Sequence, residues 1–324
     1  MVRYLIGIGI LLSLSVQAHT AHRVLKLMGS RFEFVAVHDE LQQAERSIDA
    51  AIEEVQRLER MISSWDPNSF TARVNAMAGK KRVGIPEEMY RLIERSIKVS
   101  DLTEGAFDIT IGPLLEIYTF NGGSGFPPEK LIDMRKGLVD YRKIELREED
   151  GHFFVLLKEP GMRIGFGAIG KGWAADRAKK LMEGFGLRGG MVSASGDLIC
   201  WGSPEDGEKW RVGIADPENK ERVIKWLELS NAAVVTSGDY EKYLMHANKR
   251  FSHIIDPRSG YPTSGIRSVT IITIDAEIGD ALATSVFVLG LEEGLRIVEE
   301  IDALEMIAYD EDLKEWSTSM KALK

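Results

Sequence analysis

The segment Arg163-Ile164-Gly165-Phe166-Gly167-Ala168-Ile169-Gly170-Lys171-Gly172-Trp173-Ala174-Ala175-Asp176-Arg177 carries the strongest local signal in this chain. The apolar approach at Met162 and Ile164 predicts a strand, the glycines predict a loop, and the alanine-rich continuation predicts the start of a helix. Backbone amides at a helix start are unpaired and carry the positive end of the helix dipole. The segment therefore predicts a phosphate or pyrophosphate site, and a glycine-rich turn without a ligand is the alternative.

Two nucleotide-binding motifs match this segment only in part. Its first three glycines fit G-x-G-x-x-G, with Asp197 further along as the acid that would bind a ribose. Lys171 and the glycines before it also fit the first part of a P-loop. Gly172 stands where a P-loop has the Ser or Thr that holds magnesium, so the P-loop match lacks its metal ligand.

Composition places the chain among soluble globular proteins. Its 324 residues are 44% hydrophobic and 28% charged, with a formal net charge of -9. That negative balance argues against a nucleic-acid partner, because phosphate backbones are bound by clustered Lys and Arg. The single cysteine, Cys200, cannot form an internal disulfide and is expected to be a buried small hydrophobe.

The first residues have the features of a signal peptide. Arg3 precedes an apolar run from Tyr4 to Val16, and Val16-Gln17-Ala18 suits signal peptidase. The run is short for a membrane span. We expect a signal peptide over residues 1–18, a single mature domain over 19–324 without a stable membrane span, and a periplasmic or envelope-associated location; an uncleaved anchor is the alternative.

Hydrophobic spacing predicts mixed helices and strands. Helices are expected at Glu40–Ile62, at Glu87–Leu102, at Pro128–Leu138 and after the glycine loop. Strands are expected at 24–38, 143–146, 153–157, 191–195, 198–201, 210–214, 223–229 and 232–235, and loops at 63–69 and 121–128. Many adjacent strands have no helix between them. This favours an α+β fold, with a largely antiparallel mixed sheet core flanked by helices.

Two acidic positions have both a functional and a structural interpretation. Asp280 and Thr284 lie four residues apart, on one face of an expected helix, and their oxygens suit a hard ion such as Mg²⁺. An N-cap is the alternative for Asp280. Phe107 and Asp108 form an aromatic and acidic corner, for which spacing alone favours a capped turn.

Aromatic and histidine-containing loops complete the candidates. Trp65 lies in a Ser-rich and Asp-Pro loop and is expected to be a core residue rather than a flat surface for a ring. Thr236-Ser237-Gly238-Asp239-Tyr240 is expected to follow a strand end. The segment from Ser252 to Pro262 places His253, Asp256 and an arginine around a turn.

Together these segments resemble the FAD:protein FMN transferase family, the ApbE-like flavin transferases, over residues 24–310. The resemblance rests on Met28-Gly29-Ser30, Ser64-Trp65, the segment from Gly105 to Leu114, the glycine loop, Ser195-Gly196-Asp197, the segments 236–240 and 253–257, and Asp280-Ala281-Leu282-Ala283-Thr284. It implies an ApbE-like fold and an exported enzyme. Such an enzyme transfers the FMN half of FAD to a Thr or Ser hydroxyl of an acceptor protein and releases AMP.

The resemblance also implies roles for individual residues. The positions implied to contact FAD are Met28, Trp65, Ala106, Phe107, Asp108, Lys171 and Ile266. The backbone carbonyl of Ala168 would join Asp280 and Thr284 around Mg²⁺. Many family members have Asp where this chain has Gly165, so one contact to FAD is missing here.

Mechanistic reasoning adds one catalytic candidate. The attacking hydroxyl must lose a proton, and His253 is the candidate base because an imidazole titrates near neutral pH. Asp256 is expected to orient it. Three alternatives stay open: an FAD pyrophosphatase that uses water, a non-catalytic flavin-binding envelope protein, and a nicotinamide-dependent oxidoreductase using the G-x-G-x-x-G match.

Export gives the first prediction. N-terminal sequencing of the native protein should find a start near His19, because cleavage is expected after Ala18. An intact Met1 on protein recovered from the cytoplasm would show that the signal-peptide interpretation is wrong.

Overall fold

The computed structural model describes residues 18–219, 221–239 and 242–318. The predicted signal peptide, residues 1–18, lies outside these ranges except for its last residue, Ala18. Tyr240 also lies outside them. In the described part of the chain, no helix is long and apolar enough to cross a membrane.

An eight-stranded sheet forms the centre of the molecule, in the order β1-β2-β7-β8-β11-β14-β15-β16. Its strands are β1 (His19–Leu27), β2 (Ser30–His38), β7 (Gly189–Ala194), β8 (Asp197–Gly202), β11 (Ala232–Gly238), β14 (Ile266–Thr273), β15 (Glu305–Asp310) and β16 (Glu315–Ser317). Every neighbouring pair in this sheet is antiparallel. The expected α+β fold with a largely antiparallel sheet is therefore confirmed.

Short turns with a glycine in second place set the register of the hairpins. Met28-Gly29 joins β1 to β2 and Ser195-Gly196 joins β7 to β8, and all four residues have positive φ. Asp150-Gly151 does the same between β5 (Ile144–Glu149) and β6 (His152–Leu157). Turns with positive φ at both central residues match the twist of paired strands, which is why such turns close tight hairpins.

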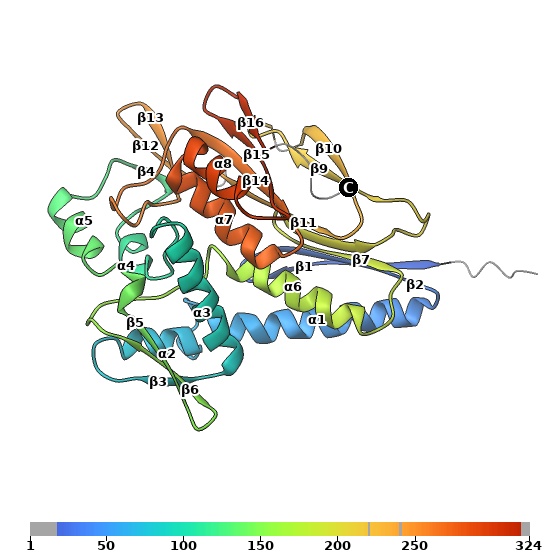
Figure 1. The fold of residues 1–324 in the computed structure, drawn as a ribbon, viewed down its shortest axis with the longest axis horizontal. Helices are drawn as coiled ribbons and strands as arrows, with labels where there is room; N and C mark the ends of the chain where they lie inside the picture. Colours follow the sequence, from blue (N-terminus) through green and yellow to red (C-terminus); the bar gives the residue numbers. More distant parts are fainter. Residues whose placement is uncertain (1–17, 220, 240–241, 319–324) are drawn as a thin grey trace, which may run out of the picture.

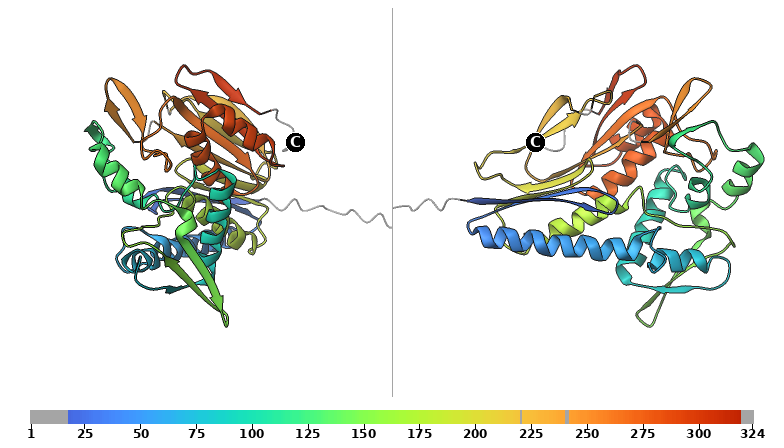
Figure 2. Two further views of the ribbon diagram at one scale, coloured as in Figure 1. Left: turned by 60° about the vertical axis from the view of Figure 1, so that its left-hand side comes forward. Right: turned by 180° about the vertical axis from the view of Figure 1, so that it is seen from behind.

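Helices cover one face of the sheet (Figures 1 and 2). They are α1 (Leu41–Ile62), α6 (Gly170–Glu183), α7 (Ala276–Leu289) and α8 (Leu291–Glu299). Apolar side chains of α1 recur every three or four residues and are buried, as the sequence predicts. Large side chains such as Phe32, Phe34, Ile48 and Leu58 pack between sheet and helices and form the main core.

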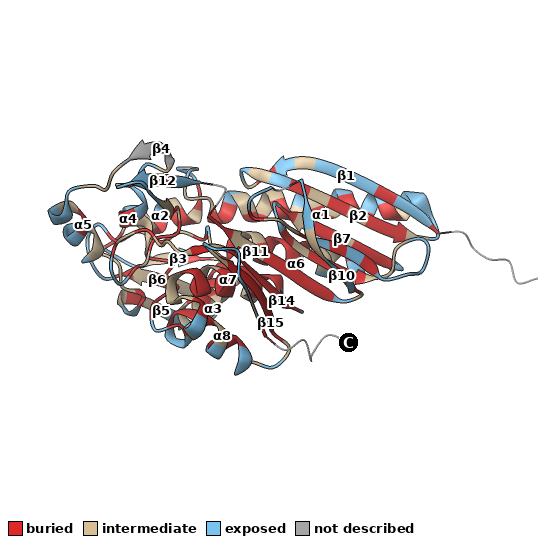
Figure 3. Ribbon diagram, turned by 90° about the horizontal axis from the view of Figure 1, so that it is seen from above, coloured by how far each residue is buried: buried red, intermediate tan, exposed pale blue. Residues whose placement is uncertain are grey.

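The opposite face of the sheet carries a second apolar cluster. The hairpin of β9 (Trp210–Ala215) and β10 (Val223–Leu229) covers it, and Cys200 lies in it, buried as expected. Figure 3 shows that the inner strands are buried while much of the edge strand β1 is exposed. Both faces of the central strands are thus shielded from solvent.

Two small sheets and the remaining helices form one end of the molecule (Figure 1). One sheet has the order β3-β6-β5 and the other β13-β12-β4. These elements are α2 (Phe70–Ala76), β3 (Val83–Ile85), α3 (Glu87–Leu102), α4 (Gly112–Leu115), β4 (Asn121–Ser124), α5 (Glu129–Lys136), the 3-10 helix η1 (Tyr141–Lys143), β12 (Tyr243–His246) and β13 (Lys249–Ser252).

The structure corrects three local predictions. The segment before the glycine loop is no sheet strand, since it makes a single parallel bridge between Arg163 and Ile111. Part of the expected loop 121–128 is the strand β4, paired in parallel with β12. The segment 236–240 does not follow a strand end, because β11 continues through Gly238. In the last two cases pairing with a distant segment overrode the local sequence signal.

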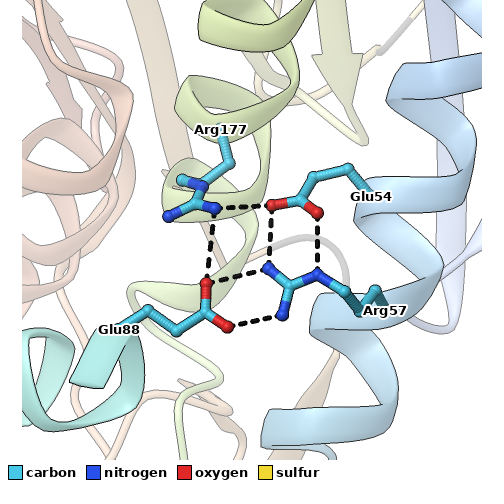
Figure 4. Close-up of polar contacts among 4 residues, drawn as sticks. All are labelled: Glu54, Arg57, Glu88 and Arg177. Carbon is cyan, nitrogen blue, oxygen red and sulfur yellow. Dashed lines mark hydrogen bonds and ion pairs between the residues drawn. The ribbon is translucent and has the colours of Figure 1, made fainter. Parts of the chain in front are cut away.

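Four charged side chains connect α1, α3 and α6 (Figure 4). Arg57 donates to Glu54 at 2.8 and 2.9 Å and to Glu88 at 2.5 and 2.8 Å. Arg177, at the end of the glycine-loop segment, donates to Glu54 at 2.8 Å. Hydrogen bonds from Arg57 hold the pKa of Glu54 below its ordinary value. The network therefore orients α6 against α1 and α3.

The start of α6 packs directly on the start of α7. A Cβ built on Gly172 would lie 2.1 Å from the carbonyl oxygen of Ala276, so only glycine permits this approach. A Cβ on Gly167, in the preceding loop, would meet nothing within 4 Å.

This contrast gives a matched pair of variants. Gly172→Ala should lower the free energy of unfolding by about 1–3 kcal/mol, because the added methyl group forces the two helices apart. Gly167→Ala should stay within about 0.5 kcal/mol of the parent. Urea denaturation of both variants checks this; equal stabilities would show that the helices separate without cost.

Candidate functional site

Segments that are far apart in sequence meet at the glycine loop. The Gly165 amide donates to the Ile109 carbonyl at 2.8 Å. A Cβ on Gly165 would lie 3.2 Å from Ser64 Oγ, and one on Gly170 would lie 3.8 Å from Met28 Cε. The β1–β2 turn, the loop after α1 and the segment around Ile109 therefore surround the candidate phosphate site. A larger residue at position 165 would fit only if Ser64 moved slightly.

Of the two aromatic rings expected to stack on FAD, only one is open to solvent. Trp65 is 95% exposed, whereas Phe107 is 2% exposed and packs in the main core beside buried Ala106. The expectation that Trp65 is a core residue is wrong. Ser63 Oγ accepts from the amides of Trp65 and Asp66 at 3.2 and 3.1 Å, in a turn that ends α1 and leaves the indole outside.

Asp108 makes the capped turn that its spacing favours. Its carboxylate accepts from the Thr110 amide and hydroxyl, both at 2.7 Å, and from the Tyr141 amide at 3.0 Å. Burial raises the pKa of Asp108, and the hydrogen bonds from Thr110 and Tyr141 oppose that rise. Asp108 therefore braces the segment beside the glycine loop, and its contact with FAD stays a prediction.

Lys171 lies between two buried carboxylates at the start of α6. Its ammonium forms an ion pair with Asp197 and lies 3.7 Å from Asp280 Oδ1. Asp197, the acid considered above for a ribose, is thus engaged by a lysine.

Asp280 does not cap its own helix. The N-cap of α7 is Asp275, whose side chain accepts from the Ile278 amide at 3.0 Å, so the N-cap alternative for Asp280 is wrong. Asp280 Oδ2 instead accepts from the Gly172 amide at 3.2 Å. One turn further along α7, Thr284 Oγ1 lies 3.5 Å from Ser237 Oγ on β11.

The donor set at this place fits a hard cation. Asp280 is 3% exposed and offers a carboxylate, and Thr284 offers a hydroxyl on the same helix. Ala168 lies partly buried in the loop that leads into α6, where its carbonyl is a candidate third ligand. Among the described residues, no group of three His, Cys, Asp or Glu side chains could hold a metal. A Mg²⁺ ion here would therefore need the hydroxyl, a backbone carbonyl, substrate oxygens and water.

His253 lies on a different element from the metal candidates. Its Nδ1 lies 3.2 Å from the Lys242 carbonyl oxygen, and its ring contacts Phe120 edge-on. Asp256 accepts from Arg258 at 3.0 and 3.3 Å, and its expected role in orienting His253 stays a prediction. Ile266 is buried at the start of β14.

Asp176 is a residue for which the sequence interpretation gave no role. Its carboxylate accepts from the amides of Ala276 and Glu277, at 3.1 and 2.8 Å, across the α6–α7 contact. An acidic side chain within an alanine-rich helix was the signal available in the sequence. The sequence did not indicate the partner of Asp176, which is the start of a helix a hundred residues later.

A separate cavity of about 510 Å³ opens between α3 and α6, and none of the predicted site residues lines it. Three arginines line it, but each is paired: Arg91 with Glu87, Arg95 with Glu277, and Arg177 with Glu54. Because these guanidinium groups are already neutralised, the cavity is no strong anion site.

Comparison with known proteins gives one consistent result. The model of the ApbE family matches residues 28–308. An FAD:protein FMN transferase of Klebsiella pneumoniae (strain 342) is 31% identical, over 80% of this chain and 76% of its own length. The crystal structure of the ApbE protein of Thermotoga maritima has a TM-score of 0.85 at 29% identity, covering 93% of this chain and 97% of its own. The flavinyl transferase ApbE of Pseudomonas stutzeri, in its apo form, has a TM-score of 0.81 at 25% identity, covering 94% and 96%.

The role of Asp108 as a brace can be tested without any ligand. Asp108→Ala should lower the free energy of unfolding by about 2–3 kcal/mol, because buried donors of Thr110 and Tyr141 lose their acceptor. Asp140→Ala, which removes an exposed cap on Arg142, should cost about 1 kcal/mol or less. Denaturation in the absence of FAD measures both; an unchanged Asp108→Ala protein would leave only a ligand-binding role.

Proposed function

Because this chain belongs to the ApbE family, we propose that it is an Mg²⁺-dependent FAD:protein FMN transferase. In this reaction a Thr or Ser hydroxyl of an acceptor protein attacks the FMN phosphorus of FAD. A new phosphoester bond forms, the pyrophosphate bond breaks, and AMP leaves. The observation that carries the proposal is the meeting of Lys171 and Asp280 at the start of α6, beside the glycine loop. We further propose that the protein acts after export, in the periplasm or at the envelope.

The chain offers a surface for each part of FAD. The Lys171 ammonium suits the pyrophosphate, because it places a positive charge at the start of α6, where the helix dipole is also positive. The exposed indole of Trp65, next to Ser64 at the rim of the loop, offers a face for the isoalloxazine or adenine ring. Met28 lies against the same loop from the β1–β2 turn.

Asp280, Thr284 and the Ala168 carbonyl would hold the metal. When bound, Mg²⁺ would neutralise the charge of the pyrophosphate as its bond to AMP breaks. Lys171 adds a fixed positive charge from the protein, and the ion pair with Asp197 fixes where that ammonium lies.

His253 would accept the proton of the attacking hydroxyl. An Nδ1–H that donates to the Lys242 carbonyl leaves the lone pair on Nε2, which is the form that a general base requires. The backbone contact thus supplies the orientation that had been expected from Asp256.

The described residues do not form the fold that the oxidoreductase alternative requires. A nicotinamide site of the G-x-G-x-x-G type is built on parallel strands joined by a helix. Here the main sheet is antiparallel, and the segment before α6 makes one bridge only.

The transfer reaction is tested directly by mass spectrometry. The mature protein, incubated with FAD, Mg²⁺ and an acceptor peptide containing Thr, should give a peptide heavier by one FMN unit. Asp280→Ala should lower the transfer rate at least about 100-fold, because it removes the only charged protein ligand, and Thr284→Ala should lower it less. EDTA should abolish transfer and added Mg²⁺ should restore it.

The control variant is Asp302→Ala, which removes an exposed carboxylate after α8. It should transfer FMN at the parent rate. Free FMN without a peptide adduct would favour the pyrophosphatase, and FAD binding without turnover would favour the non-catalytic alternative. Full transfer by Asp280→Ala would refute the metal assignment.

A further inference from the structure

Helices α6 and α7 each receive a carboxylate from the other at their starts. Asp176 of α6 accepts from Ala276 and Glu277, the first two residues of α7. Asp280 of α7 accepts from Gly172, the third residue of α6. The first amides of a helix have no partner within the helix, so each of these side chains supplies acceptors that the start of the other helix lacks.

The amides at the start of α7 are fully accounted for among the described residues. Asp275, the cap of α7, accepts from the Ile278 amide with its side chain. The Gly279 amide donates to the Asp275 carbonyl at 3.0 Å. The cap leaves the amides of Ala276 and Glu277 without an acceptor on its side chain. Asp176 accepts the hydrogen bonds from these two amides. Asp176 thus fixes the start of α7 from another helix, one turn before Asp280.

We propose that Asp176 is a positioning residue for the metal site, holding α7 so that Asp280 and Thr284 face the glycine loop. This inference rests on the metal site of the proposed function. Asp176 itself does not touch the metal ligands. It sets the position of α7, the helix that carries them. Lys171, at the other end of the α6–α7 contact, is itself a residue of α6.

Two acidic side chains lie close to Asp176. They are Asp275 and Glu277, and Glu277 is paired with Arg95 at 2.6 and 2.8 Å. Burial, and next the Asp275 carboxylate, raise the pKa of Asp176 to about 8, although the two amides oppose the rise. An acid whose pKa is raised on folding stabilises the fold below its unfolded pKa near 4. That contribution is lost as the pH rises toward 8.

The test measures metal binding rather than turnover. Mn²⁺ binding by the mature protein with FAD, followed by the electron paramagnetic resonance of the free ion, should weaken roughly tenfold or more in Asp176→Asn. The matched control is Arg95→Met, which breaks the ion pair between α3 and Glu277 at the start of the same helix and leaves the α6–α7 bonds. It should bind Mn²⁺ nearly as the parent does, although it loses a similar or greater amount of stability. Raising Mg²⁺ should restore the kcat of Asp176→Asn but not that of Asp280→Ala.

The outcomes separate this inference from the proposed function. If Asp280→Ala binds Mn²⁺ as the parent does, the metal site is wrong and both fail. If Asp280→Ala loses Mn²⁺ while Asp176→Asn binds it normally, only the positioning role fails. It also fails if Asp176→Asn and Arg95→Met weaken Mn²⁺ binding in proportion to their loss of stability, because Asp176 then acts only as a brace.

Discussion

The packing of two helix starts against each other is the constraint on which the candidate site depends. Gly172 allows the backbone of α6 to approach α7 closely, and the two starts exchange carboxylates. The first amides of each helix have no partner within that helix, and these side chains are their acceptors. One of them, Asp280, is also the candidate metal ligand.

The fold class could be predicted from local patterns because the hairpins and long helices are local. The spacing of apolar residues along Glu40–Ile62 and the turns Asp150-Gly151 and Ser195-Gly196 specify their own elements. The strand β4 could not be predicted in this way. Its four residues include two glycines, and it exists only because β12, more than a hundred residues later, pairs with it.

The candidate site was predictable as a set of residues and less so as a set of contacts. The sequence placed Asp280 and Thr284 on one helix face, and the structure agrees. The sequence could not indicate that Lys171 pairs with Asp197 or that Arg258 pairs with Asp256. It also could not indicate that Trp65 is exposed. Each of these depends on where a second segment folds, and residue type alone does not specify that.

The strand order has a consequence for the order in which the molecule can form. β2 pairs with β7, so the N-terminal hairpin cannot join the sheet until a strand roughly 150 residues later has been made. β11 is enclosed between two strands only once β14 has been made. Folds dominated by such distant pairings form slowly. The loop for phosphate and the helix bearing Asp280 also come from separate thirds of the chain. An emerging polypeptide therefore carries neither a closed sheet nor a complete candidate metal site until nearly all of it has been made.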